Sequence, residues 1–142
     1  QKVNGIISMT GEKVHERQFI EAVHEAEIET GIKTKFFVGF ADIQDSVYHL
    51  YFEFADKDID QGKAEDFTKV VDAKLKKINV EYEAKRDSFR VKDPITHILQ
   101  SESFETYKAR CIDMGARDGQ FKLNLLMQDE KRHAMFKDLI RK

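Results

Sequence analysis

Two segments of the chain carry the periodicity of amphipathic helices. In residues 14–30 the apolar side chains of Phe19, Val23 and Ala26 recur at i, i+4 and i+7, with glutamates on the rest of the surface. Gly31 follows this segment, at a position where helices commonly end. A second, longer helix is predicted over residues 63–82, where one apolar stripe is formed by Phe67, Val71, Leu75, Ile78 and Tyr82.

Three further segments have the composition of β-strands. Residues 3–9 are short and β-branched and stop at a Thr-Gly turn, whereas residues 35–43 are nearly continuously apolar, as in a strand covered on both faces. Residues 46–55 alternate, and the short polar link before them predicts an antiparallel hairpin. The alternation puts Tyr48, Leu50, Phe52 and Phe54 on one face of this strand and His49, Tyr51 and Glu53 on the other.

The C-terminal third adds a strand and two helices. Residues 95–99, after Pro94, are predicted as the last strand, and a loop is expected over residues 116–126. The order strand, helix, strand, strand, helix, strand predicts an α+β fold with a ferredoxin-like split β-α-β sheet, antiparallel and with both long helices on one face. Two additional C-terminal helices would cover the other face; their apolar positions are Phe104, Tyr107, Cys111 and Met114, ending at Gly115, and then Met135, Phe136, Leu139 and Ile140.

Length and charge restrict the classes of function. A chain of 142 residues fits a single domain over residues 1–142, and its formal net charge of −2 disfavours a general nucleic-acid binder. No apolar run is long enough for a membrane span. The only cysteine, Cys111, excludes an internal disulfide and favours a reducing compartment such as the cytoplasm. These features predict no nucleic-acid partner and no membrane partner.

The histidines give no recognisable metal or catalytic pattern. They form no H-x-x-x-H pair and have no carboxylate at a convincing ligand spacing, so we expect no metal site and isolated, partly packed rings. Cys111 lies on the apolar stripe of its helix and is predicted to be a core residue. The five histidines are His15, His24, His49, His97 and His133.

Two glycine-containing segments are candidates for anion binding. Residues 10–14 form a turn between a strand and a helix and carry Lys13, which is either a solvated turn residue or a cation available to a ligand. Residues 118–123 present Gln120 and Lys122 beside a glycine, and backbone N–H groups with an ammonium favour negative charge. The alternative for this second segment is a surface loop that buries Phe121.

These same segments resemble a known family. Residues 6–16, IISMTGEKVHE, look like the segment just after the hinge in acyl-adenylate-forming ligases. Residues 118–123, DGQFKL, are similar to the C-terminal motif of the auxin-responsive acyl-acid amido synthetase family, the Gretchen Hagen family. The family's motif usually continues with Pro-Arg, whereas Leu123 is here followed by Asn124 and Leu125.

The resemblance implies the C-terminal lid domain of a two-domain enzyme whose N-terminal domain lies outside this chain. Such enzymes activate a carboxylic acid with ATP, release pyrophosphate and pass the acyl group to an amino acid. ATP and magnesium would be bound mainly by the N-terminal domain, which is the implied partner together with the two small substrates. The resemblance implies that Lys122 is the catalytic lysine, that Gln120 shapes its loop, and that Lys13 either contacts phosphate or pairs with Glu12 or Glu16.

A second hypothesis is a free-standing ferredoxin-like module that binds a small molecule or a partner chain through its sheet. Its ligand face would be formed by His49, Tyr51 and Glu53. RNA binding by an exposed aromatic sheet is a more distant alternative, because the chain is acidic and lacks the signature of that class.

Overall fold

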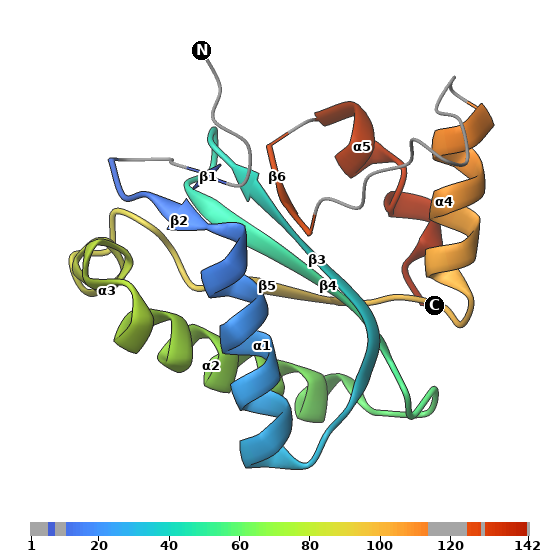
Figure 1. Ribbon diagram of the computed structural model, residues 1–142, viewed down its shortest axis with the longest axis horizontal. Coiled ribbons are helices and arrows are strands. Elements are labelled where there is room, and N and C mark those ends of the chain that lie inside the picture. Colours follow the sequence, from blue (N-terminus) through green and yellow to red (C-terminus); the bar gives the residue numbers. More distant parts are fainter. Residues whose placement is uncertain (1–5, 8–10, 114–124, 129, 142) are drawn as a thin grey trace.

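The computed structural model describes residues 6–7, 11–113, 125–128 and 130–141. A central sheet lies between two helical layers (Figure 1). The elements are β1 Ile6–Ile7, β2 Val14–His15, α1 Glu16–Thr30, β3 Thr34–Asp42, β4 Val47–Phe54, α2 Gln61–Ile78, α3 Val80–Asp87, β5 Ile95–Ile98, α4 Ser103–Asp113, β6 Leu126–Met127, α5 Glu130–Ala134 and the 3-10 turn η2 Lys137–Leu139.

The sheet has four strands in the order β5-β4-β3-β6. The predicted hairpin of β3 and β4 lies at its centre and is antiparallel, while β5 runs parallel to β4 and β6 runs parallel to β3. The α+β class and the placement of both long helices on one face are therefore confirmed. The sheet is mixed, however, and the prediction of an antiparallel sheet was wrong.

The first strand does not join this sheet. β1 pairs with β2 in a separate two-stranded sheet, with Ile7 opposite Val14. The place beside β3 is taken by β6, which begins at the end of the segment predicted as a loop. A close approach makes this pairing possible, because a Cβ on Gly39 would lie only 3.1 Å from Leu126 and 3.2 Å from the ring of Phe19. Because Gly39 has no side chain, α1, β3 and β6 can pack together at this position.

Two apolar cores lie on the two faces of the sheet. Phe37 and Ala41 of β3 face α1 and α2, whereas Phe36, Val38 and Phe40 face the C-terminal layer. Burial on both faces explains why this strand lacks clean alternation, and it confirms that the C-terminal elements cover the second face. The predicted core residue Cys111 is buried in the second core, at 5% exposure.

Helix boundaries depart from the sequence prediction at one joint. Gly31 ends α1 in the left-handed conformation with φ 77°, as expected for a helix C-terminus. The helix predicted over residues 63–82 is instead broken at Asn79, whose extended backbone separates α2 from α3. The terminal helix is likewise shorter than expected, because α5 stops at Ala134 and a 3-10 turn follows.

Candidate functional site

In the described part of the turn that carries Lys13, residues 11–14, Lys13 is the only side chain that is exposed. Gly11 has φ 110°, a conformation that L side chains rarely adopt, and Val14 is fully buried. Glu12 is also fully buried and accepts a hydrogen bond of 3.0 Å from the hydroxyl of Tyr48. Burial and the Glu12 carboxylate raise the pKa of Tyr48 well above its usual value, so the phenol stays protonated and donates.

The two carboxylates expected as partners of Lys13 are both engaged elsewhere. Glu12 contacts Tyr48, and Glu16 accepts a hydrogen bond from the backbone N–H of Leu125. In the part of the chain that the structure describes, the Lys13 ammonium has no ion pair and its side chain is exposed. Of the two alternatives left by the sequence, the pairing with Glu12 or Glu16 is absent here.

The backbone of Lys13 is fixed by the joint between α2 and α3. Its carbonyl oxygen accepts a hydrogen bond of 2.6 Å from the Asn79 side-chain amide, and its N–H donates to Glu81 at 3.4 Å. The same Asn79 amide donates to Gln18 in α1 at 3.0 Å, and the Asn79 oxygen accepts from the N–H of Tyr82 at 2.8 Å. One buried asparagine thus ties the turn, α1 and α3 together.

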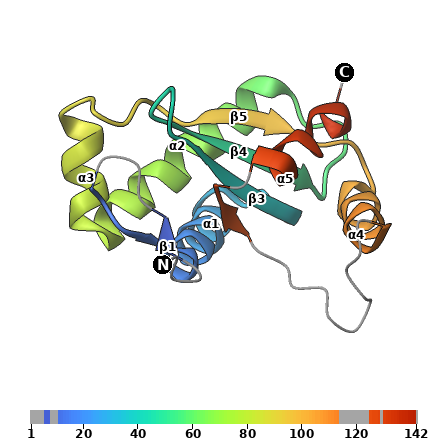
Figure 2. The ribbon, with the colours of Figure 1, turned by 90° about the horizontal axis from the view of Figure 1, so that it is seen from above.

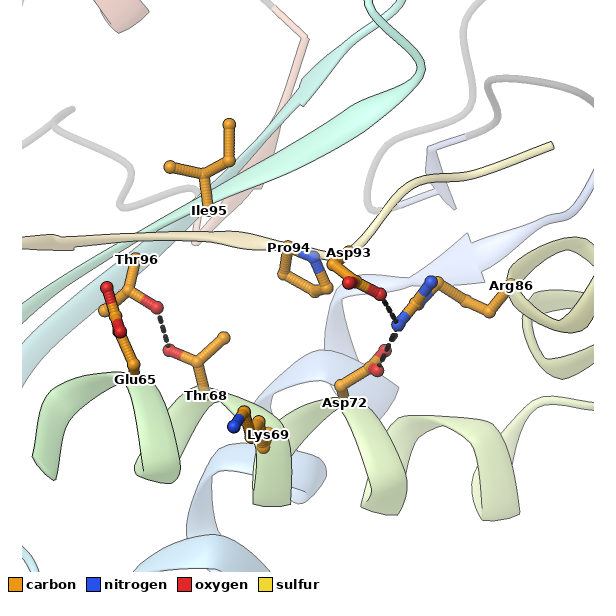
Figure 3. A pocket seen from close by; sticks show the side chains of 9 residues that line it. All are labelled: Glu65, Thr68, Lys69, Asp72, Arg86, Asp93, Pro94, Ile95 and Thr96. Carbon is orange, nitrogen blue, oxygen red and sulfur yellow. Dashed lines mark hydrogen bonds and ion pairs between the residues drawn. The ribbon is translucent and has the colours of Figure 1, made fainter. Parts of the chain in front are cut away.

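A buried ion network holds α3 in place (Figure 3). Arg86 donates to both oxygens of Asp72, at 2.9 and 2.7 Å, and to Asp93 at 2.7 Å. The hydrogen bonds to Asp72 raise the pKa of Arg86 further above its usual value, despite its burial. Tyr82 also donates to Asp72, at 2.6 Å, so every member of the network has a partner. These contacts therefore hold α3 against α2 although the helix is broken at Asn79.

A second lysine approaches the Lys13 turn from α3. A Cβ placed on Gly11 would lie 3.8 Å from Nζ of Lys85, an ordinary van der Waals distance, so this ammonium lies close to the turn. Figures 1 and 2 both show α3 at the same end of the molecule as β1 and β2. Lys13 is exposed and Lys85 is half-buried, and two ammonium groups near one turn fit the negative charge of a phosphate group.

The remaining predicted site residues, Gln120 and Lys122, lie outside the described residues. Leu125, the first described residue after residues 114–124, forms hydrogen bonds through both its N–H and its carbonyl group. Its N–H donates to Glu16 at the start of α1, and its carbonyl accepts from Gly39 of β3 at 2.8 Å. Leu125, two positions after the DGQFKL segment, is therefore anchored close to the first turn of the helix that follows Lys13.

Three histidines that the sequence left isolated meet on the second face of the sheet. His49 Nδ1 and His97 Nε2 are 2.9 Å apart, and the His133 ring stacks on Phe40 with centroids 3.7 Å apart. Tyr51 also bonds to His133 Nε2. Register could have indicated a further contact of the cluster, because β4 and β5 pair Tyr51 with His97 and their rings stack with centroids 4.4 Å apart. No local signal indicates His133, which is 82 residues from Tyr51.

The environment of this histidine cluster favours the neutral rings of His97 and His133. Burial, followed by the nearby His49, lowers the pKa of both His97 and His133 to about 4. Burial raises the pKa of Tyr51 to about 12, so its hydroxyl remains a donor. Among the described side chains, no three His, Cys, Asp or Glu groups are placed so that they could hold a metal ion.

The sheet face proposed for a free-standing binding module is not open. Tyr51 and Glu53 are 2% and 3% exposed, because the C-terminal layer covers them. Glu53 accepts hydrogen bonds from the N–H groups of Glu102 and Phe104, at 2.9 and 3.2 Å, and so satisfies the start of α4. The hypothesis that His49, Tyr51 and Glu53 form a ligand face was therefore wrong, since Glu53 has a structural partner.

Comparisons with known proteins point to one family. Residues 17–131 match the model of the GH3 family C-terminal domain. The fold is similar to the solved structure of GH3.15 acyl acid amido synthetase, with a TM-score of 0.82 and 16% identity, over 100% of this chain and 27% of that chain. A second similar structure is AtGH3.15 acyl acid amido synthetase in complex with 2,4-DB, with a TM-score of 0.77 and 15% identity. That match covers 100% of this chain and 26% of that chain. The chain thus spans about a quarter of either solved protein. No curated protein sequence matches it.

Proposed function

The chain belongs to the GH3 family, as its C-terminal domain, and we propose that it is the lid domain of an ATP-dependent, acyl-adenylate-forming ligase that joins a carboxylic acid to an amino acid. The observation that carries this proposal is the family match over residues 17–131. In the proposed reaction a carboxylate oxygen attacks the α-phosphorus of ATP, pyrophosphate leaves, and the acyl group then passes to an amine. The proposed partner is an N-terminal domain that binds ATP, magnesium and the acid.

We assign Lys13 a phosphate contact in this enzyme. Its backbone is held by Asn79 and its ammonium is exposed without an ion pair among the described residues. An exposed lysine on an anchored turn loses little backbone freedom when it binds, which favours a contact to a ligand presented from outside the domain. The neighbouring Lys85 adds positive potential at the same turn.

Lys122 is proposed as the catalytic lysine, with Gln120 shaping its loop. Lys122 is three positions before Leu125, and three steps of the chain span at most about 11 Å. Leu125 in turn bonds to Glu16, three residues after Lys13. Chain connectivity therefore supports a common site for the two lysines. Charge builds on phosphoryl oxygens during attack at phosphorus, and a fixed cation stabilises it most in a site closed to water.

The test is ATP–pyrophosphate exchange in the larger protein that contains this domain. We expect Lys122→Ala to lower the exchange rate by about 10²–10³-fold, by analogy with the loss of one fixed oxyanion donor. Lys13→Ala should raise the KM for ATP. The matched control is Lys63→Ala, because Lys63 is exposed on the first turn of α2, at the other end of that helix from Asn79. Equal rates for wild type and Lys122→Ala would remove Lys122 from the mechanism.

We further propose a cytoplasmic location for the enzyme. A single cysteine that is buried in the second core suits a reducing compartment. Among the described residues no helix has both the length and the apolar character needed to cross a bilayer. Fractionation of cells that express the tagged protein tests the location, and recovery in an oxidising compartment would contradict it.

A further inference from the structure

A cavity of about 510 Å³ lies between α2 and the segment that leads into β5 (Figure 3). This volume falls in the range of small-molecule sites. Its walls come from α2, α3 and residues 93–96. None of the residues that line it belongs to the Lys13 turn. The ring of Pro94 supplies an apolar wall between the polar groups at the two ends.

Several polar groups of this cavity are already satisfied by one another. Arg86 donates to Asp72, to Asp93 and to the carbonyl of Val91, which uses four of the five N–H groups of a guanidinium. The hydroxyl of Thr96 donates to that of Thr68 at 2.6 Å. These bonds fix the walls, so the cavity is largely preformed.

Two groups of opposite charge remain available at its rim. The Asp93 side chain is 88% exposed and bonds to Arg86 through one oxygen only. Lys69 is exposed, and its ammonium has no ion pair among the residues that the structure describes. A third charged group, Glu65, is one helical turn before Lys69 and accepts a bond from Gln61 at 3.2 Å.

The two charges border the same cavity, one from α2 and one from the segment before β5. Asp93 is fixed beside Asp72, because both bind the same nitrogen of Arg86 at 2.7 Å. Lys69 and Asp72 are three positions apart on α2, so their Cβ atoms are about 5–6 Å apart. A molecule that carries an ammonium and a carboxylate on nearby carbons offers each of these two charges, which border the same cavity, a complementary group.

We propose that this cavity between α2 and β5 binds a zwitterionic small molecule, whose ammonium group contacts Asp93 and whose carboxylate contacts Lys69. The aliphatic part of the ligand packs on Pro94. A ligand with only one of the two charges contacts only Lys69 or only Asp93 and binds more weakly. The proposal does not rest on the adenylation chemistry, so either can fail while the other stands.

The test is titration of the isotope-labelled chain, followed by amide chemical shifts, with three probes of nearly the same shape. L-leucine carries both charges, 3-methylbutylamine lacks the carboxylate, and 4-methylpentanoate lacks the ammonium. We expect millimolar binding of L-leucine with shifts confined to residues 65–72 and 93–96, because exposed ion pairs contribute little each. Both single-charge probes should bind at least about five-fold more weakly, the effect of one charge pair at about 4 Å in water.

Two variants separate the roles of the charges. Lys69→Met should weaken L-leucine by about five-fold and leave 3-methylbutylamine unchanged, whereas Asp93→Asn should weaken L-leucine and leave 4-methylpentanoate unchanged. Arg86 keeps its paired bonds to Asp72 in Asp93→Asn, so the fold is retained. Lys63→Met, outside the cavity, is the control. Absence of localised shifts, equal binding of all three probes, or variants that bind like wild type would each overturn the proposal.

Discussion

Among the polar residues of the Lys13 region, Asn79 is the one whose substitution is expected to lower the free energy of unfolding most. It is 6% exposed, and its side chain makes hydrogen bonds to the carbonyl of Lys13, to Gln18 and to the N–H of Tyr82. In Asn79→Ala the N-terminal cap of α3 is lost, which costs about 1 kcal/mol. The two donor bonds contribute about 1 kcal/mol each. The free energy of unfolding should therefore fall by about 3 kcal/mol, which lowers the Tm by about 10 °C for a domain of this size.

Urea unfolding of the purified chain measures this change. Asn79→Ser is the matched variant, because serine keeps a good capping acceptor for Tyr82 but has no amide donors for Lys13 and Gln18. It should lose about 2 kcal/mol, with faster amide hydrogen exchange in the Lys13 turn. A loss below about 0.5 kcal/mol in Asn79→Ala would refute the reasoning. Equal stability of the two variants would show that the cap contributes nothing.

Three further predictions concern pH, a strained residue and a tight contact. His97 and His133 have pKa values near 4 in the folded state but about 6.5 in the unfolded state. As the pH falls, the unfolded state therefore takes up protons first. The stability that is present above pH 6.5 is lost as the pH falls toward 4. After allowance for partial exposure, we expect the free energy of unfolding to fall by about 2 kcal/mol between pH 7 and pH 5. Urea unfolding at these two pH values should show a smaller fall for His133→Gln than for the wild type. Phe89 has φ 61° and is 81% exposed, so Phe89→Gly should raise the free energy of unfolding by about 1 kcal/mol in the same assay, and a decrease would contradict the assigned strain. Gly39→Ala should lower the Tm by several degrees, because its Cβ would lie 3.2 Å from Phe19, and an unchanged Tm would mean that the ring moves freely.

The sequence indicated the elements whose signal is contained in a few neighbouring residues. Alternation in residues 46–55 placed Leu50 and Phe52 on the face that packs against α1 and α2, because side chains of a strand alternate whatever its partners are. Gly31 marked the end of α1 for a similarly local reason, since glycine adopts the left-handed conformation at low cost. The break at Asn79 was missed, because the apolar stripe continues through Ile78 to Tyr82 and the bond to Lys13 that favours the break is distant in sequence.

The candidate site was only partly accessible to sequence reasoning. Lys13 was identified from its segment, but the sequence left its pairing with Glu12 or Glu16 open. The structure decides this point, because the Lys13 ammonium forms no ion pair among the described residues, while Glu12 and Glu16 accept hydrogen bonds from Tyr48 and Leu125. Neither partner could be named from local spacing, since each is separated from its glutamate by dozens of positions.

The order of residues alone therefore determined the periodic helices, the central hairpin and the two covered faces of β3. The tertiary structure alone decided that β6 rather than β1 pairs with β3, and that His49, His97 and His133 meet. Periodicity follows from backbone geometry that every residue imposes on its neighbours. Strand partners and side-chain clusters depend on where distant segments return, and that choice is made by packing around particular residues such as Gly39 and Phe40.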